Sequence, residues 1–190
     1  MPRWKADGRE RLQGAAVELF RERGYEAVTV AEIAARAGLT KRTFFNHFTD
    51  KREVLFAGAA DLEAEVLRQL KDADSTASPF DVAIEALGRA GQTLSEFAPY
   101  TSLRRDLINS SAELRERDLM KAASLSAAIA AELETQGASS RVAAFAAQCA
   151  VAVFGVAYNH WADAPETNFT ALITATAADL QKAVAATPRD

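Results

Sequence analysis

The amino-acid sequence predicts an all-α protein. Among its 190 residues there are only five prolines and nine glycines, so few positions disfavour a helix. Long runs that alternate apolar and polar residues, the pattern of half-buried strands, are absent. Alanine, leucine and glutamate, which are strong helix formers, dominate the chain. We therefore expect helices along the whole sequence, separated by short breaks.

The first helix has both a start signal and a stop signal. Asp7 followed by Glu10 makes a capping box, and Gly24 supplies a left-handed stop. Between them, apolar residues recur at the spacing of one helix face, at Leu12, Ala15, Ala16, Leu19 and Phe20. The pattern predicts one helix that buries this face.

Two short helices follow the first. Thr29 with Glu32 makes a second capping box, and Gly38 ends that helix after roughly two turns. Thr40 can cap a third helix, from Lys41 to about Phe48. A short helix pair joined by a glycine-containing turn is the geometry of a helix-turn-helix. Any two-helix hairpin in a bundle could share this pattern.

A fourth helix is predicted to begin after Asp50. Asp50 with Glu53 makes a third capping box, which would start a longer helix to about Lys71. Four helix starts within about fifty residues predict a compact bundle.

Beyond residue 71 the breaks are polar. The segment "KDADSTASPF" reads as a linker, and Pro79 suits the first turn of the next helix. Further helices are expected at about 79–97, 100–109, 112–136, 139–163 and 167–186.

The third helix has two kinds of side chain. Leu39, Phe44 and Phe48 are expected to fill the interior of the head. The side chains expected to face outward, fully or in part, are Lys41, Arg42, Thr43, Phe45, Asn46 and His47.

The charge of the chain is unevenly distributed, since residues 1–53 carry a net charge of +3 and residues 54–190 a net charge of −7. A basic head on an acidic body favours DNA binding by the head, although solvated helix faces also vary by a few charges.

Residues 9–53 resemble the DNA-binding domain of the TetR (tetracycline-repressor-like) family of bacterial transcriptional regulators. The resemblance lies in "AAVELF" and "GY", then "TVAEIAARAGLT", then "TFFNHFTDK" with Glu53 after it. It implies a DNA-binding head at residues 1–53 and a helical regulatory and dimerisation body at residues 54–190. The function implied is that of a small-molecule-responsive repressor that binds a pseudo-palindromic operator in double-stranded DNA as a homodimer.

The resemblance also implies roles for single residues. Thr29 and Thr40, at helix N-termini, would hold phosphate oxygens. Lys51 matches a lysine that clamps the DNA backbone, although it can also be an ordinary solvated lysine. The first turn of the third helix would point at base edges, with Lys41, Arg42 and Thr43.

For several residues of the third helix the sequence leaves more than one role open. Arg42 is the best candidate for a guanine contact, and Asn46 could read an adenine or bind a phosphate. His47 could contact phosphate or be a surface histidine. Phe45 stands where the family most often has a tyrosine, so it lacks the hydroxyl that would reach a phosphate.

The body is expected to bind both a ligand and a second copy of the chain. Helix 139–163 is apolar nearly all round, so it must be covered on both sides, within one chain or by a partner. The resemblance implies that the last two helices form the homodimer interface, and that each body holds a pocket for a small apolar or aromatic inducer. Candidate pocket residues, for which core packing is the alternative, are Phe97, Tyr100, Leu103, Arg104, Leu107, Phe145, Gln148, Cys149 and Tyr158.

Composition argues against several other classes of protein. No run of about eighteen apolar residues occurs, so no membrane span is expected. With two histidines, one cysteine and no Walker or Rossmann glycine pattern, we expect no enzyme, no metal and no cofactor. The single cysteine and the absence of an apolar leader favour the cytoplasm. The alternatives to a ligand-responsive regulator are a helical adaptor that binds protein, or a regulator without a ligand.

Overall fold

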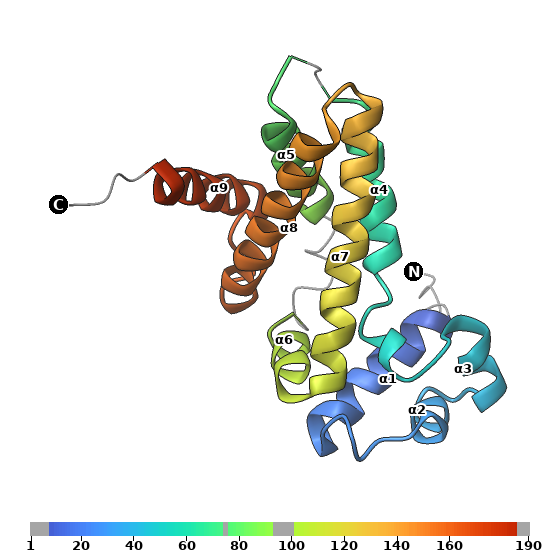
Figure 1. The fold of residues 1–190 in the computed structure, drawn as a ribbon. Coiled ribbons are helices and arrows are strands. Elements are labelled where there is room, and N and C mark those ends of the chain that lie inside the picture. The colour runs from blue at the N-terminus through green and yellow to red at the C-terminus, as the bar shows by residue number, and fades with distance from the viewer. Residues whose placement is uncertain (1–7, 74–75, 93–100, 186–190) are drawn as a thin grey trace, which may run out of the picture. The chain divides into compact units, whose positions relative to one another are not determined.

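A computed structural model describes residues 8–73, 76–92 and 101–185, and these residues form helices and no strand (Figure 1). In chain order the elements are α1 (Gly8–Arg23), α2 (Val30–Arg36), α3 (Lys41–His47), the 3-10 turn η1 (Arg52–Val54), α4 (Ala59–Lys71), α5 (Pro79–Gly91), α6 (Thr101–Ser110), α7 (Ala112–Thr135), α8 (Ser140–Asp163) and α9 (Phe169–Ala185). The all-α prediction is confirmed. The expected helix at 79–97 extends to Gly91, and its last residues lie outside the described ranges.

The described residues form two compact units. The first unit contains the chain up to Gly58 together with Leu103–Asp118, and the second contains the rest. Helix α7 is continuous, so its first residues belong to the first unit and the others to the second. The predicted boundary at residue 53, between a DNA-binding head and a regulatory body, is not the boundary of these units, and it stays a prediction.

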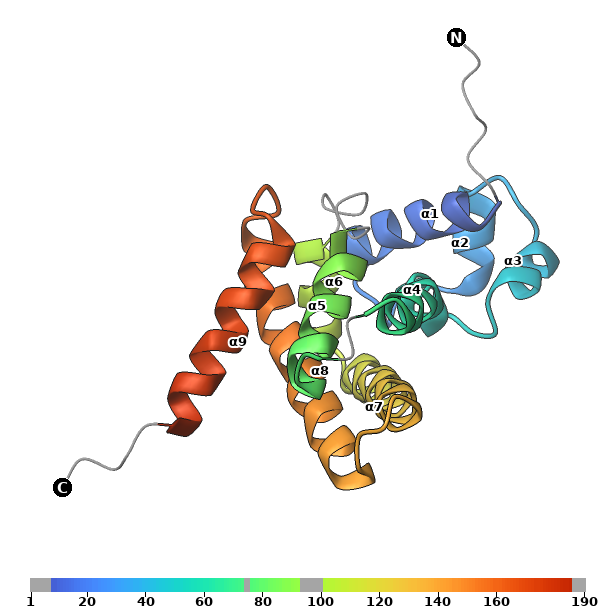
Figure 2. The same ribbon diagram turned by 90° about the horizontal axis from the view of Figure 1, so that it is seen from above.

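In the first unit α1 packs against both α2 and α3 (Figure 2). The face of α1 that the sequence predicts to be buried is buried, with Leu12, Ala15, Ala16, Leu19 and Phe20. Gly24 ends α1 with a φ of 79°, which only glycine adopts without strain. The predicted capping box of α1 needs Asp7, which lies outside the described residues.

The helix-turn-helix follows the predicted signals. Thr29 and Glu32 form the capping box of α2 with both hydrogen bonds present. Gly38 has a φ of 65° in the turn, and Thr40 caps α3 by accepting a hydrogen bond from the backbone N–H of Thr43. Arg11 on α1 donates to the carbonyl of Ala37 at 2.5 Å, so the turn is also held from outside the two helices.

The fourth helix differs from the prediction. Instead of one helix from Asp50 to Lys71, the chain forms η1, then a turn, and only then α4 from Ala59. Asp50 does accept hydrogen bonds from the backbone N–H groups of Arg52 and Glu53, but they start a 3-10 turn.

Distant side chains explain why the helix is interrupted. Arg104 donates to the carbonyl of Leu55 at 2.9 Å, and Arg9 donates to the carbonyl of Ala57. These carbonyls are the acceptors that the next helical turn would use. Gly58, which has a low helix propensity, follows them directly.

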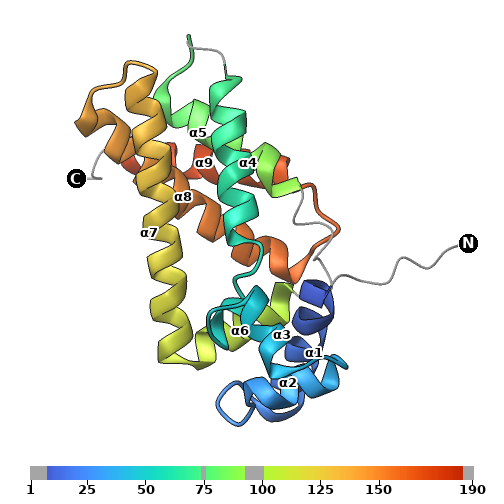
Figure 3. The same cartoon turned by 90° about the vertical axis from the view of Figure 1, so that its right-hand side faces the viewer.

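The second unit is built around α5, which packs against α4, α8 and α9 (Figure 3). Residues of α7 complete its core, through Leu125, Ile129 and Leu133. Helices α5 and α9 approach closely because Gly91 has no side chain, and a Cβ there would overlap the ring of Phe169. Pro79 occupies the first turn of α5, as predicted, and Ser78 caps the helix.

Helix α8 occupies the range of the apolar helix predicted at 139–163, but its length and hydropathy run against the expectation that no segment could span a membrane. Among the described helices it alone is long and apolar enough to cross a membrane, with a window of mean hydropathy 1.6. It nevertheless packs on α5 and α9 through a buried face that includes Ala147, Val153 and Trp161. Its apolar character is therefore accounted for, on this side, by the core of the second unit.

Candidate nucleic-acid interface

The outward face of α3 is the candidate interface. Phe44 and Phe48 are buried in the first unit, and Leu39 is half-buried. The side chains that the sequence places on the opposite face are exposed or, for Thr43, half-buried, and they are Lys41, Arg42, Thr43, Phe45, Asn46 and His47. The apolar residues of α3 thus fix which side of the helix is presented to solvent.

Arg42 has the most freely available cation on this face. Its guanidinium makes no hydrogen bond or ion pair with any part of the chain that the structure describes, and the residue is exposed. Lys41 is also exposed, with its ammonium 5.9 Å from the centre of the Phe45 ring. Phe45 itself is 49% exposed, which is unusual for a phenylalanine and leaves its ring open to a partner.

The two threonines at helix starts are already hydrogen-bonded. The hydroxyl groups of Thr40 and Thr43 are hydrogen-bonded to each other at 2.9 Å. The backbone N–H and the hydroxyl of Thr29 both donate to the Glu32 carboxylate, at 2.8 and 2.7 Å. Hydrogen bonds from Thr29 and then from Arg23 lower the pKa of Glu32 to about 2. A phosphate at Thr29 would have to share or replace these bonds.

Two other expected contacts have specific surroundings. The His47 imidazole lies beside Gly8, so it stands on the side of α3 next to the start of α1. Lys51 is half-buried, and its ammonium donates to the carbonyls of Tyr25 and Val28 at 2.8 and 3.0 Å. The expected lysine clamp is therefore engaged within its own unit.

A group of ion pairs in the first unit was not found from the sequence. Arg117 pairs with Glu53 at 2.6 Å, and Arg52 pairs with Glu113 at 3.3 Å. The partners are about sixty residues apart, so no local spacing could reveal them. They hold η1 against the start of α7.

The predicted ligand-lining residues fall into three groups. Phe97 and Tyr100 lie outside the described residues. Leu103, Arg104 and Leu107 belong to α6 in the first unit. The remaining four belong to α8 in the second unit, and they are Phe145, Gln148, Cys149 and Tyr158.

The candidate pocket residues within the described ranges differ in their surroundings. The Arg104 guanidinium pairs with Asp118 at 3.3 Å and lies 5.1 Å from the centre of the Phe56 ring. Phe145 is 64% exposed, on the same side of α8 as the exposed Gln148 and Cys149. The pocket itself stays a prediction.

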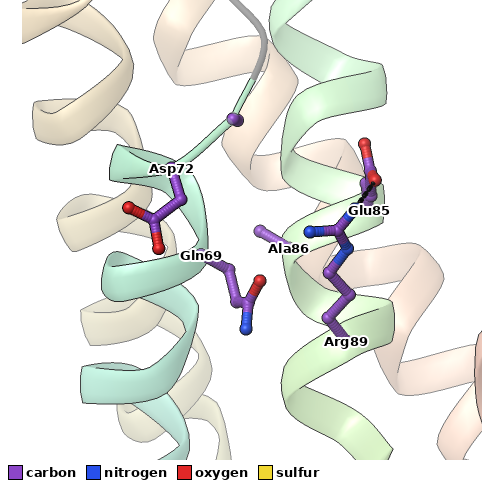
Figure 4. Close-up of a pocket in the computed structure, with 6 residues that line it drawn as sticks. Gln69, Asp72, Glu85, Ala86 and Arg89 are labelled. Atoms are coloured by element: carbon purple, nitrogen blue, oxygen red, sulfur yellow. Dashed lines mark hydrogen bonds and ion pairs between the residues drawn. The ribbon is translucent and has the colours of Figure 1, made fainter.

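A recess in the second unit has a different lining. It has a volume of about 220 Å³ and lies between α4 and α5, as Figure 4 shows. Its walls are largely polar and include an ion pair between Glu85 and Arg89 at 2.5 Å. None of the predicted ligand residues lines it. The described residues also contain no group of three or more His, Cys, Asp or Glu side chains that could hold a metal ion.

Residues 14–57 match the model of the family described as "Bacterial regulatory proteins, tetR family". This range runs from the middle of α1 through α2, α3 and η1, and so contains the whole candidate interface.

The transcriptional regulator TcmR of Streptomyces glaucescens is 38% identical over 63 residues, which is 33% of this chain and 28% of TcmR. The chain covers 23% of the transposon Tn10 TetC protein of Escherichia coli and 37% of the transcriptional regulator YvdT of Bacillus subtilis, so it spans well under half the length of these three relatives.

The fold of the whole chain matches solved structures. The fatty acid degradation regulator FadR from Bacillus halodurans has a TM-score of 0.61 at 19% identity, over 98% of this chain and 99% of that one. FadR from Bacillus subtilis in complex with stearoyl-CoA has a TM-score of 0.56 at 18% identity, over 89% and 95%. At these identities the likeness concerns the fold.

Proposed function

We propose, since residues 14–57 match the family model of the bacterial regulatory proteins of the tetR family, that this chain is a DNA-binding transcriptional regulator. In this proposal it is a small-molecule-responsive repressor that acts in the cytoplasm. It binds a pseudo-palindromic operator as a homodimer, with residues 1–53 as the DNA-binding head and residues 54–190 as the regulatory and dimerisation body.

The outward face of α3 carries the proposal. In a helix-turn-helix the second helix enters the major groove and its first residues meet the base edges. The exposed Arg42 guanidinium stands in that first turn without a partner among the described residues, and it has the fork that matches the O6 and N7 acceptors of guanine. Lys41, Thr43 and Asn46 extend the same polar surface, while Phe45 offers an apolar contact to a thymine methyl or a sugar.

An unpaired face of α8 supports the homodimer. Side chains that are exposed in the single chain follow one another at the spacing of one helix face, and those that are large and apolar are Val142, Phe145 and Val156. A contiguous apolar face of this kind in a soluble regulator is explained if a second copy covers it. A two-fold dimer would present two recognition helices to two half-sites about one helical turn apart.

The ligand is the least specific part of the proposal. The solved FadR structure that contains stearoyl-CoA shares the fold of this chain, and the predicted lining residues are largely apolar or aromatic. We therefore propose a small apolar or aromatic inducer with a few polar atoms. Its binding would favour a conformation of the dimer with lower affinity for the operator.

A salt titration of DNA binding tests the proposed function. Fragments of the source genome are first selected for binding to the purified chain. The dissociation constant of a selected fragment is then measured between about 50 and 300 mM salt, a range that includes the physiological ionic strength of ~0.15 M. A DNA-binding regulator should lose affinity with a log–log slope of about −0.9 for each phosphate that it neutralises. If no fragment binds more tightly than about micromolar, in the range of non-specific binding, the proposal fails.

A further inference from the structure

The loop between α1 and α2 is held by two side-chain cations. Residues 24–28 form no regular structure, so several of their carbonyls have no partner within a helix. Arg23 donates to the carbonyl of Ala27 at 2.9 Å. The ammonium of Lys51 donates to the carbonyls of Tyr25 and Val28 at 2.8 and 3.0 Å. Three carbonyls of this loop are therefore satisfied by side chains.

The two hydrogen bonds of Lys51 link segments on either side of the helix-turn-helix. Lys51 follows α3, which ends at His47, whereas the loop precedes α2, which begins at Val30. The bonds therefore connect the chain just before the helix-turn-helix to the chain just after it, across 23 and 26 positions. Gly38 lies in the turn at the other end of the pair, where Arg11 holds the carbonyl of Ala37. The helix pair is thus tied at both ends.

The ammonium of Lys51 has little capacity left for another partner. Besides the two carbonyls, the Tyr25 ring covers it, with 4.0 Å between Nζ and the ring centre. Tyr25 is 4% exposed and Val28 is 1% exposed, so the loop residues that Lys51 holds are anchored in the core. Burial raises the pKa of the Tyr25 hydroxyl, so the ring beside the ammonium stays neutral. An ammonium group has three hydrogens, and two are used for the carbonyls.

We propose that Lys51 is a positioning residue for DNA binding, which ties the loop 24–28 to the end of α3 and does not itself hold a DNA phosphate. The inference rests on the proposed DNA-binding function. Lys51 acts through the start of α2, because Val28 is followed directly by the N-cap Thr29. With the loop released, α2 and α3 would sample more than one placement, and the fraction of molecules ready to bind DNA would fall.

Two variants with the same chemical change separate positioning from phosphate contact. Lys51→Met keeps an unbranched side chain, one atom shorter, and removes its charge and its donors. Lys41→Met makes the same change on the exposed face of α3, where the ammonium donates no hydrogen bond to the described part of the chain. We measure amide hydrogen exchange of residues 25–30 without DNA, and the salt dependence of DNA binding for both variants.

The expected results differ for the two lysines. Lys51→Met should speed the exchange of residues 25–30 and weaken DNA binding about tenfold, while the slope of log K against log salt changes by less than about half a unit. Lys41→Met should leave the exchange of these amides unchanged and reduce the slope by up to about 0.9. Unchanged loop exchange with a slope reduced by about 0.9 in Lys51→Met would overturn the proposal.

A measurement on the unaltered chain covers the case in which Lys51→Met fails to fold. With ¹⁵N-labelled lysine, the Lys51 ammonium should give a slowly exchanging signal without DNA, and its shift should stay the same when DNA is added. A Lys51 signal that appears only with DNA would show a phosphate contact and refute the positioning role. If the unaltered chain binds no DNA, the proposed function fails, and the hydrogen-exchange experiment still decides whether Lys51 holds the loop.

Discussion

The Nε of Arg117 lies 2.6 Å from Oε1 of Glu53, and this ion pair joins two segments that are 64 positions apart. Both side chains are mostly shielded from water, with 27% and 16% of their surfaces exposed. Because the pair connects the start of α7 to η1, it helps to make residues 103–118 part of the first unit.

Removing either partner should therefore destabilise the first unit. Arg117→Met or Glu53→Gln should each cost about 1–3 kcal/mol, between the values for exposed and for fully buried pairs. The double variant should cost less than the sum, as urea unfolding can measure. Glu116→Gln, at an exposed glutamate on the same helix, is the control and should cost less than about 0.5 kcal/mol. Additive costs for Arg117 and Glu53 would mean that the pair contributes nothing.

Arg42→Ala should reduce the preference for one base pair of the operator. The loss should be about 1–3 kcal/mol for the preferred base, with little change for operators that are already altered at that position. Competition binding with a set of single-base operator variants measures this. An equal loss with every operator would instead assign Arg42 to a phosphate.

Phe45→Tyr should tighten DNA binding modestly. The ring is half exposed on α3, and a hydroxyl at its tip would add one donor towards a phosphate. A gain of about 0.5–1.5 kcal/mol is expected, a few-fold in the dissociation constant. Phe45→Leu lacks the hydroxyl and serves as the control, without any gain. If both variants bind like the unaltered chain, position 45 lies away from the DNA backbone.

Phe145→Glu should break the proposed homodimer. The side chain is 64% exposed in the single chain, and a carboxylate in the proposed interface would be buried without a partner. Analytical ultracentrifugation should show a shift from dimer to monomer at micromolar concentration. Leu119→Glu makes a similar change at an exposed leucine on α7 and should leave the dimer intact. Dissociation by Leu119→Glu alone would place the interface on α7.

Glu32 should make the first unit sensitive to acid. Hydrogen bonds from Thr29 and Arg23 lower the pKa of its carboxyl from 4.5 to about 2 in the folded chain. Its contribution to stability is therefore fully present above about pH 4.5, and it is lost as the pH falls towards 2.

Denaturant unfolding at several pH values checks this contribution. Glu32→Gln should be less stable than the unaltered chain at pH 6, and the difference should shrink between pH 4.5 and 2. Glu65→Gln, in the second unit, should behave alike, because Arg68 and Gln69 lower the pKa of Glu65 to about 2. A difference for Glu32→Gln that stays constant with pH would contradict the assignment.

Signals that act over a few residues were sufficient to predict most of the fold. The capping box at Thr29 and the positive φ of Gly24 and Gly38 are properties of short segments, and the helices end where these residues indicate. The prediction of the fourth helix was wrong because Arg104 and Arg9, far away in the sequence, donate hydrogen bonds to carbonyls of the turn before α4. No periodicity of residues 50–71 contains that information.

The candidate interface could be predicted only in part, for the same reason. Alternation of buried Phe44 and Phe48 with polar residues fixes the outward face of α3, and this was readable from the sequence. The partners of Lys51 are backbone carbonyls, which every residue has, so no sequence pattern marks Tyr25 and Val28 as its acceptors.

Because α7 is unbroken and begins in the first unit, it limits how the first unit could be transferred to another protein. A chimera cut after Gly58 would carry α2 and α3 into another protein, but it would leave behind Arg104 and Arg117, which secure η1 and the turn that follows it. A transplantable head must bring residues 103–118 from the middle of the gene. Recombination at one point would therefore tend to produce poorly folded hybrids, and two coordinated crossovers would be needed for a working one.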